Sequence, residues 1–497
     1  MEQDASRTPP SFANGTRLFV CVLAAVYAAA YASIWVQADG LIGSSGILPA
    51  GQFLRLAREQ LGRSAWYELP TLCWIFGTGH FIGILCGLGV CVSVVLFLGF
   101  AQAPCLALLW AGYLSLVCVG QIFFDFQWDG LLLETTLLAI FVVPWTLARA
   151  REPFDPPRLG RYLVWWLLFR LMFLSGVVKL TSGDRTWSHL RALGFHYQTQ
   201  PLPTPLAWFA HQLPAWFQVG SCAVMFGVEL GAPFCILAPR RIRHGAALAM
   251  IALQVAIAMT GNYAFFNLLT IALCLTCLDD NWWRDRHWGV VVPAENPQEF
   301  HAIPARVRAT ATRWFAAFAV GVTFFETVAA VSPGAAASPI VRTVAEAVGP
   351  SRSFNDYGLF AVMTVERPEL IFEGSDDGRD WREYTLPYKP GTLARRPTWV
   401  APHQPRLDWQ LWFAALGSPD DNPWVGRVCE LLLRGDPALL GLFSHNPFPA
   451  HPPLYMRVVR YRYEFTSEAE RSRTGNWWRR TPIDFYMPAM SLSSQTK

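Results

Sequence analysis

The sequence predicts a membrane all-α bundle of about eight to nine transmembrane helices, followed by a smaller C-terminal soluble domain that is mainly β. Three observations predict this division. Of the 497 residues, 53% are hydrophobic and only 15% are charged, whereas ordinary soluble domains carry roughly 25% charged residues. Long apolar runs dominate residues 17–331, and charges reach soluble density only after Gly349. Strand-like alternation of apolar and polar residues is confined to that later part.

Composition also places the domain boundaries. The stretch Ser332–Pro339 (SPGAAASP) is rich in residues that end helices, so it marks a linker. We expect five parts in chain order: a cytoplasmic N-terminal tail at 1–16, a polytopic transmembrane domain at 17–331, a linker at 332–349, a soluble β-rich domain at 350–490 and a disordered tail at 491–497.

Nine apolar segments are candidates for spans, which need about 20 residues each. They are 17–38, 72–99, 104–124, 128–147, 162–180, 217–238, 245–260, 263–278 and 312–331. The seventh and eighth are short and meet at Gly261-Asn262. They form either a tight helical hairpin or one broken helix, which leaves the count at eight or nine.

Arginines in the short loops predict the orientation, because they favour the cytoplasmic side. With a cytoplasmic N-terminus and nine spans, fourteen loop arginines fall on the cytoplasmic side and five on the other. This arrangement places everything after residue 331 in the ER lumen or the periplasm. Eight spans would put the arginine-rich loop 279–313 outside instead, which the bias disfavours.

The C-terminal part contains clear strand and helix patterns. Residues 370–384 read as strand, Asp-Asp-Gly turn and strand. Residues 455–465 alternate outward charges with inward aromatics, as in a half-buried strand. Because 409–416 and 424–433 look helical, we expect a small β-sandwich with helical insertions.

Several ionisable or amide side chains lie within the apolar segments, where a charge costs roughly 2.5–3.5 kcal/mol to insert. The ones we single out as a polar core are Asp129, Glu134, Arg170, Lys179, Glu229, Asn262 and Asn267. Arg170 lies in the middle of its segment without a carboxylate on the same helix, so Glu134 or Glu229 is its expected partner. Such a pair either fixes the packing of the helices or lines a polar cavity.

Lys179 is one of only three lysines, because almost all positive charge here is arginine. It either extends its amine to the membrane interface or acts as a base, which arginine cannot do. The non-cytoplasmic loop 181–216 adds four further candidates, which are His196, Tyr197, Gln200 and His211. The two histidines do not have a metal-binding spacing, so no metal is expected.

Other functions are excluded by what the sequence lacks. There is no clustered basic face for nucleic acid, and the net charge is only +4. Neither a G-x-S-x-G elbow nor an HExxH, P-loop or dinucleotide-binding motif occurs. We therefore expect no cofactor. Ten of the eleven cysteines lie in apolar segments and Cys429 is alone in the soluble part, so that part has no internal disulfide.

The polar landmarks resemble the lipase maturation factor family. In the membrane part the matching motifs are Leu41–Ala50 (LIGSSGILPA), Phe126–Glu134 (FQWDGLLLE), Arg170–Lys179 (RLMFLSGVVK), His196–Pro205 (HYQTQPLPTP) and Thr260–Asn267 (TGNYAFFN). In the C-terminal part they are Asn355–Phe360 (NDYGLF), Ala401–Trp409 (APHQPRLDW), Asn446–Pro449 (NPFP) and Trp477–Arg480 (WWRR). The resemblance covers residues from about 17 to 488.

This resemblance implies a membrane-anchored folding and assembly factor for secreted lipases, not an enzyme. Animal members are ER membrane proteins that lipoprotein, hepatic and endothelial lipases need in order to mature, and client lipases and membrane lipids are the implied partners. A bacterial member would lie in the inner membrane. The C-terminal domain would bind the client, with six tryptophans as candidate anchors. They are Trp399, Trp409, Trp412, Trp424, Trp477 and Trp478.

A second, shorter resemblance supports an alternative function. Ser175–Leu180 (SGVVKL) together with Trp187 is similar to the membrane segment of vitamin K-dependent carboxylase-like proteins. It implies an intramembrane enzyme that uses Lys179 as a base on a lipid or quinone-like substrate. Nothing in the sequence predicts the oligomeric state.

Overall fold

The computed structural model describes residues 11–148, 154–286, 305–332 and 338–492. Seven helices in these ranges are long and apolar enough to cross a membrane, and the chain is a multi-pass membrane protein. They are α1 (Ala13–Trp35), α6 (His80–Phe97), α7 (Gln102–Val119), α9 (Arg158–Thr181), α13 (Ala215–Phe226) with its continuation to Leu237, α14 (Arg240–Thr260) and α17 (Ala305–Val331). The continuation of α13 consists of a π turn, η3 (Gly227–Gly231), and a 3-10 turn, η4 (Ala232–Leu237).

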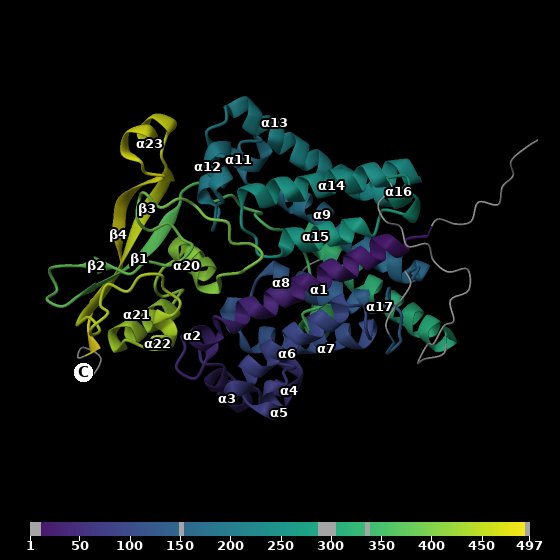
Figure 1. The fold of residues 1–497 in the computed structure, drawn as a ribbon, viewed down its shortest axis with the longest axis horizontal. Helices are drawn as coiled ribbons and strands as arrows, with labels where there is room; N and C mark the ends of the chain where they lie inside the picture. The colour runs from purple at the N-terminus through teal and green to yellow at the C-terminus, as the bar shows by residue number, and fades with distance from the viewer. Residues whose placement is uncertain (1–10, 149–153, 287–304, 333–337, 493–497) are drawn as a thin grey trace, which may run out of the picture.

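Two of the nine expected spans form helices that are too short to cross a membrane alone. The segment 128–147 gives α8 (Gln127–Ala139), of 13 residues, and 263–278 gives α15 (Phe266–Leu275), of 10 residues. At 1.5 Å per residue, neither reaches the roughly 30 Å of a hydrocarbon core. The expectation of two full spans here was wrong. In the second segment, hydropathy does not reveal that the chain leaves the helix at Gly261 and turns at Ala264 and Phe265 before α15 begins. Since α14 and α15 pack side by side (Figure 1), the hairpin alternative holds.

Short helices fill the connections at the bundle ends. Between α1 and α6 they are α2 (Ala38–Ile42), α3 (Ala50–Leu61), α4 (Ala65–Glu68) and α5 (Cys73–Phe76). Between α9 and α13 they are α10 (Arg185–Ser188), α11 (Ala192–Thr199) and α12 (Pro205–His211). The remaining short helices before the sheet are α16 (Asp280–Arg284) and α19 (Pro339–Val348).

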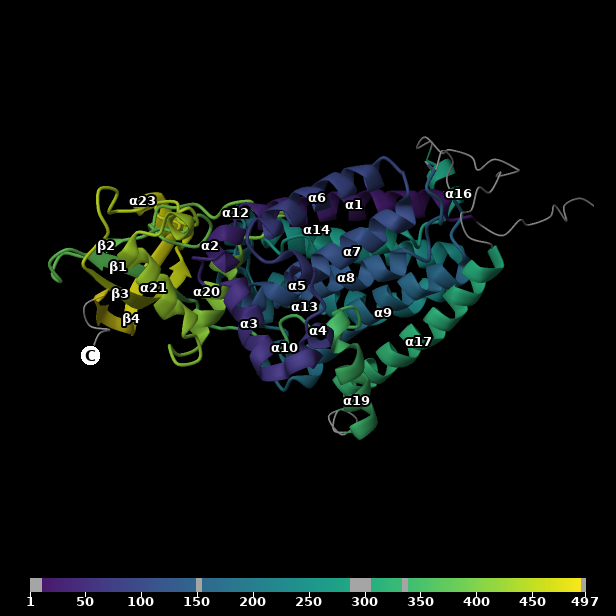
Figure 2. The same ribbon diagram turned by 90° about the horizontal axis from the view of Figure 1, so that it is seen from below.

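The described parts of the arginine-bearing loops that we assigned to the cytoplasm lie at one end of the bundle (Figure 2). There the Phe12 backbone N–H donates to Asp155 Oδ1 over 2.7 Å, and Arg243 pairs with Asp279 at 3.0 Å. The Asp280 carboxylate accepts the backbone N–H groups of residues 13 and 14. Because Asp280, which is distant in sequence, satisfies these first N–H groups of α1, the helix begins at Ala13, four residues before the predicted start. Figure 2 shows α16 at this end and the sheet at the opposite end.

The C-terminal part is built on one four-stranded antiparallel sheet in the order β2-β1-β3-β4. The strands are β1 (Pro368–Ser375), β2 (Arg382–Glu383), β3 (Tyr455–Phe465) and β4 (Trp478–Met490). The predicted strand, turn and strand over 370–384 is therefore confirmed. The register pairs Phe372 with Val458, and Val459 with Phe485.

Helices take the place that a second sheet would have in a sandwich. They are α20 (Arg406–Leu416), α21 (Trp424–Arg434) and α22 (Pro437–Leu440), and α23 (Glu468–Thr474) lies in the β3–β4 connection. The buried side chains of Phe372 and Val458 belong to one core with Leu411 and Val428 from α20 and α21. α21 is amphipathic, whereas α20 is buried around most of its circumference between the sheet and the bundle. Together they cover the inner face of the sheet without further strands.

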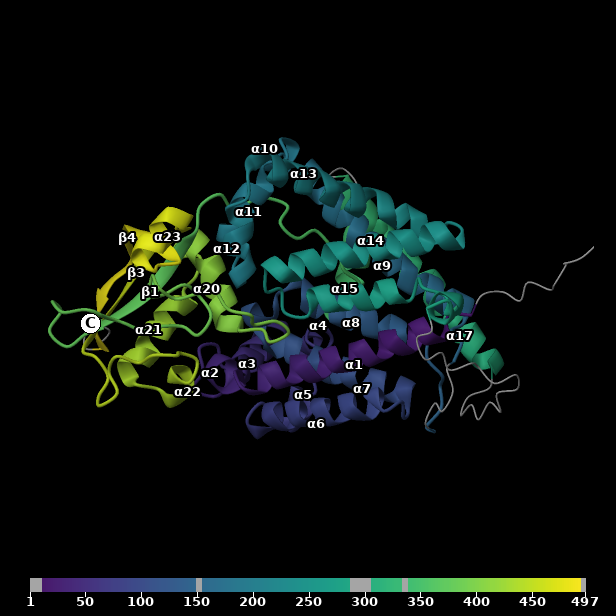
Figure 3. The ribbon, with the colours of Figure 1, turned by 45° about the horizontal axis from the view of Figure 1, so that its top comes forward.

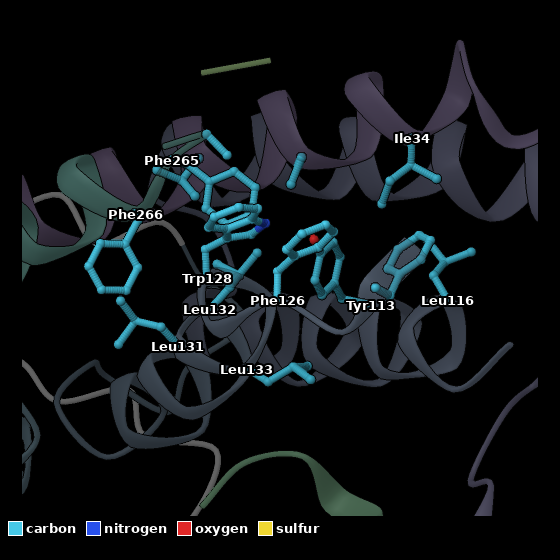
Figure 4. Close-up of a cluster of buried hydrophobic side chains, with 14 of the residues drawn as sticks. Ile34, Tyr113, Leu116, Phe126, Trp128, Leu131, Leu132, Leu133, Phe265 and Phe266 are labelled. Carbon is cyan, nitrogen blue, oxygen red and sulfur yellow. The ribbon is translucent and has the colours of Figure 1, made fainter. Parts of the chain in front are cut away.

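The same hydrophobic core continues into the membrane part. Figure 4 shows Ile34 of α1, Tyr113 of α7 and Trp128 of α8 in a single buried cluster. The Trp128 ring meets the Trp409 ring of α20 edge-on, with centroids 4.6 Å apart. The C-terminal domain and the bundle therefore share one continuous packed interior.

Candidate functional site

Asp129 of the expected polar core is buried in an ion pair with the C-terminal domain. Its two carboxylate oxygens accept hydrogen bonds from the Arg406 guanidinium at 2.8 and 2.9 Å, and both side chains are about 1% exposed. The Tyr113 hydroxyl also donates to Asp129 and lies 3.2 Å from Arg406 Nη2. The guanidinium lies over the Phe124 ring at 3.7 Å. An intramembrane carboxylate is thus neutralised by an arginine that enters from the soluble part.

Arg170 pairs with Glu134, one of the two partners that we expected. The second Glu134 oxygen accepts the Tyr357 hydroxyl at 2.6 Å and the Asn355 backbone N–H at 3.2 Å. Arg170 in turn donates to the Asn355 carbonyl at 2.9 Å. Residues 353–363, which we call the strap, therefore run across α8 and α9 and complete a buried polar network inside the bundle.

Residues 398–404 of the C-terminal domain are also hydrogen-bonded to the membrane part, through amide side chains. Asn262 donates to the Thr398 carbonyl at 2.8 Å and accepts the backbone N–H groups of Val400 and Ala401 at 2.8 and 3.1 Å. Trp128 donates to Gln404 Oε1 at 2.6 Å. These buried hydrogen bonds across the junction favour one position of the C-terminal domain on the bundle.

Another buried charge cluster joins the sheet to the loop 181–216. Glu369 of β1 lies between Arg367, at 2.7 Å, and Lys389, at 2.6 Å. Arg367 also donates to the carbonyls of Gln198 and Pro201, at 2.9 and 2.7 Å. Burial lowers the pKa of the Lys389 ammonium, while Glu369 opposes that shift.

Lys179 lies apart from this junction, in a pair with Glu229. Its Nζ is 2.9 Å from both Glu229 oxygens and donates to the Ser175 carbonyl at 2.9 Å. Glu229 reaches it from η3, and π turns of this kind are frequent at functional sites. Asn267 donates to Gln254 Oε1 at 2.9 Å nearby.

The Lys179–Glu229 pair and Asn267 line a cavity of about 990 Å³ between α9, α11, α13 and α14. Most of the other lining side chains are apolar. Such a volume lies at the upper end of the range for ligand pockets, roughly 300–1,000 Å³. This cavity and the junction around Asp129 and Glu134 are the two candidate functional sites.

Three of the four loop candidates lie in or beside the cavity, and His211 lies apart from both sites. His196 and Tyr197 line the cavity. Gln200 accepts a hydrogen bond from the Tyr263 hydroxyl at 2.7 Å, whereas His211 packs beside the Phe465 ring. In the described residues, no group of three or more His, Cys, Asp or Glu side chains is arranged to hold a metal ion.

Five of the six candidate tryptophans are buried. Trp409, Trp412, Trp424, Trp477 and Trp478 are between 1% and 8% exposed, while Trp399 is 55% exposed. Trp412, for example, donates to the Thr199 carbonyl at 2.9 Å. Burial gives these five a packing role and leaves Trp399 as the one of the six on the surface.

Comparison with known proteins assigns both halves of this architecture to one family. The model of the lipase maturation factor transmembrane domain matches residues 15–285. The model of the lipase maturation factor C-terminal domain matches residues 353–488, which begins with the strap. The chain belongs to the lipase maturation factor family.

Relatives cover nearly the whole chain. Lipase maturation factor 2 of Gallus gallus is 35% identical across 96% of this chain and 82% of its own length. The Homo sapiens protein of that name is 35% identical across 97% and 83%, and lipase maturation factor 1 of Mus musculus is 33% identical across 99% and 90%. No solved structure matches the chain.

Sequence reasoning missed the C-terminal partners of the polar core. Arg406 and Asn355 lie inside stretches that resemble the family, yet we did not predict that they enter the bundle. The available signal was a charge on each side: Asp129 lacks a basic residue on its helix, and Arg406 stands just before the apolar segment 409–416. Charge complementarity alone does not select among the many arginines of this chain.

Proposed function

We propose that this chain promotes the maturation of secreted or exported lipases and that it binds them through the C-terminal domain, outside the cytoplasm. Family membership supports the lipase role, and the arginine bias supports the orientation. The membrane would be that of the endoplasmic reticulum, or the inner membrane in a bacterium. Protease added to sealed vesicles tests the orientation: digestion of the C-terminal domain only from the cytoplasmic side contradicts it.

An exposed patch on the sheet supports the client-binding part. The patch comprises Trp381 in the connection from β1 to β2, Arg457 and Tyr461 of β3, and Ile483 and Phe485 of β4; the first three are half-buried and the last two are exposed. Arg457 lies over the Trp381 ring at 4.1 Å and 5.3 Å from the Phe485 ring centroid, and Phe485 is 63% exposed. Tryptophan, tyrosine and arginine are the residues enriched at binding hot spots. We call this surface the sheet patch.

The sheet edge itself is less suited to binding. β4 is an edge strand whose outer side is unpaired in the described sheet. An incoming strand would need backbone N–H donors there, but Pro482 and Pro488 have none. Side chains of the sheet patch are therefore the proposed contact, and strand addition is the weaker alternative.

The test is capture of a lipase by the full-length chain. Lipoprotein lipase is co-expressed in cells that lack their own lipase maturation factors, and both its capture and its secreted activity are measured. Truncating a hot spot costs about 2 kcal/mol, or roughly 30-fold in affinity, so Phe485→Ala should reduce both strongly. Phe413→Ala is the matched control, because Phe413 is also exposed in this domain but lies outside the patch.

Two results would contradict this proposal. One is capture of the lipase by the wild-type chain at the level of an unrelated multi-span membrane protein. The other is an equal loss with Phe485→Ala and Phe413→Ala, which would mean that general damage to the domain explains the effect.

An intramembrane enzyme is the second candidate, since Lys179 lines a cavity beside a carboxylate. The geometry favours a protonated lysine, because both Glu229 oxygens are within 2.9 Å of Nζ, whereas a base must first lose that proton. Lys179→Arg keeps the positive charge and removes the base. Full rescue of lipase secretion by this variant eliminates the enzyme hypothesis.

A further inference from the structure

The cavity beside Lys179 opens sideways between two membrane-spanning elements. α14 packs against η3, η4 and α12, and residues of α13 and α14 line the cavity. Figure 3 shows these two helices at the outer side of the bundle. Its rim includes Trp216 and Val224 of α13, which are 74% and 66% exposed, and Met259 of α14, which is 47% exposed. In a bilayer these apolar rim residues meet lipid chains, so the cavity is open to the membrane.

Small residues keep the interior of the cavity empty. Ala249, Ala252 and Ala256 of α14 recur at helical spacing and all line it. Small residues on membrane helices usually allow close packing against another helix, but here they face open space. A Cβ added to Gly220 on α13 would meet no atom within 4 Å. The walls are therefore shaped around space that an additional molecule can fill.

The polar side chains at the inner part of the cavity are already paired with each other. Lys179 is bound to Glu229, and Asn267 to Gln254. A charged ligand would have to separate the ion pair and leave one buried charge without a partner, which is strongly unfavourable. The inner part therefore suits an uncharged ligand.

One cavity-lining residue still has an unsatisfied hydrogen-bonding atom. Tyr263 donates its hydroxyl hydrogen to Gln200, so His196 Nε2 carries the hydrogen in its 2.9 Å contact with Tyr263. Nδ1 of His196 is then an acceptor, and it has no partner among the described residues. Neighbouring atoms cover it, so a ligand reaches it only when the ring turns towards the cavity that it lines. Burial and the Lys179 charge lower the pKa of His196 to about 4, so the ring is neutral at physiological pH. A hydroxyl donor would satisfy this nitrogen.

We propose that the cavity is an intramembrane binding site for a neutral acylglycerol, with its hydrocarbon chain between α13 and α14 and its hydroxyl-bearing head among His196, Lys179 and Glu229. The apolar walls, the lateral opening, the uncharged inner part and the unsatisfied acceptor together define this ligand: a long chain with an uncharged hydrogen-bond donor. This inference does not depend on how the chain binds lipases.

A photoreactive monoacylglycerol with a diazirine on its acyl chain tests the proposal. The full-length chain in phosphatidylcholine nanodiscs is irradiated with this probe, and labelled peptides are identified by mass spectrometry. We expect labelling on α13 and α14 that excess unlabelled monoacylglycerol removes. Val224→Trp should reduce it about tenfold, the effect of one overpacking side chain. Val219→Trp is the control, because Val219 is exposed on the same helix but does not line the cavity.

Several outcomes would overturn the proposal. Labelling that Val224→Trp leaves unchanged, or that Val219→Trp reduces equally, shows that the probe only samples the lipid-facing surface. Competition by additional phosphatidylcholine as effective as that by monoacylglycerol shows bulk lipid in the groove. Competition by an isoprenoid quinone alone shows a different ligand class. Because Val224 is on the surface, its replacement leaves the buried core intact, and an unchanged melting temperature confirms that.

Discussion

Removing the Arg406 guanidinium should loosen the C-terminal domain from the bundle. Arg406 and Asp129 are both about 1% exposed and share two hydrogen bonds, at 2.8 and 2.9 Å. Arg406→Met keeps much of the apolar volume but leaves the Asp129 carboxylate with only the Tyr113 hydroxyl as donor. Breaking a buried pair from one side costs about 3–5 kcal/mol, which corresponds to a factor of roughly 10²–10⁴ in the docking equilibrium.

The double variant gives the decisive comparison. Asp129→Leu together with Arg406→Met removes both charges, and such apolar replacements of buried pairs are often neutral or stabilising. Adding Tyr113→Phe removes the hydroxyl that would otherwise remain unpaired. We therefore expect each single variant to be far weaker than wild type, and the combined variant to recover most of the loss.

The assay separates docking from folding. A specific protease site replaces residues 333–337, the purified chain is cleaved, and size-exclusion chromatography measures how much C-terminal fragment stays with the membrane fragment as urea rises. Wild type should remain associated, whereas Arg406→Met should dissociate at lower urea. Additive losses in the combined variant, or a single variant as tightly docked as wild type, would refute the account of this ion pair.

Three further predictions follow from buried contacts. Burial raises the pKa of the Asp408 carboxyl from 3.8 to about 6 in the folded state. The free energy of unfolding therefore falls by about 3 kcal/mol as the pH rises from 4 to 6. The gain in melting temperature from Asp408→Asn should grow across this window and stay constant above it; a constant gain at every pH contradicts the shift. Asn262→Ala removes three hydrogen bonds to the C-terminal domain at about 1 kcal/mol or more each, and limited proteolysis within 395–403 should accelerate; unchanged proteolysis argues against this role. Gly358→Ala brings a Cβ to 2.8 Å from the Val178 side chain and should cost about 1–3 kcal/mol, which Val178→Ala should partly restore in thermal melts; no rescue would exclude this clash as the cause.

Local patterns in the sequence predicted the elements of this fold well. Hydropathy is a property of neighbouring residues, and each of the nine segments that it predicted contains a helix among the described residues. Local strand and turn patterns located β1 and β3. Hydropathy overestimated the lengths of α8 and α15, because contacts with other segments determine where these helices end. Gly261–Phe265, for example, is held open by bonds from Asn262 to residues 398–401. A hydropathy profile contains no term for such contacts.

The candidate sites were predicted less completely, since their parts are distant in sequence. Each charge in the apolar segments was recognised as unusual, and the Arg170–Glu134 pair was among the expected ones. Asp129 and Arg406, however, are 277 residues apart, and Lys179 and Glu229 are 50 residues apart. The rarity of lysine drew attention to Lys179, but only the folded chain shows that a π turn brings Glu229 to it.

The two candidate sites have different consequences for how this family member works. The junction around Asp129 and Glu134 fixes the C-terminal domain, so the sheet patch has a constant height and direction relative to the bundle, as a client that approaches the membrane surface would require. The cavity lies on another side, between α13 and α14, yet Trp187 beside Lys179 donates to the Phe360 carbonyl of the strap at 2.9 Å. The strap therefore contacts both sites. Leu359 and Phe360 of the strap also line the cavity, so a ligand in the proposed site would touch the segment that holds the C-terminal domain.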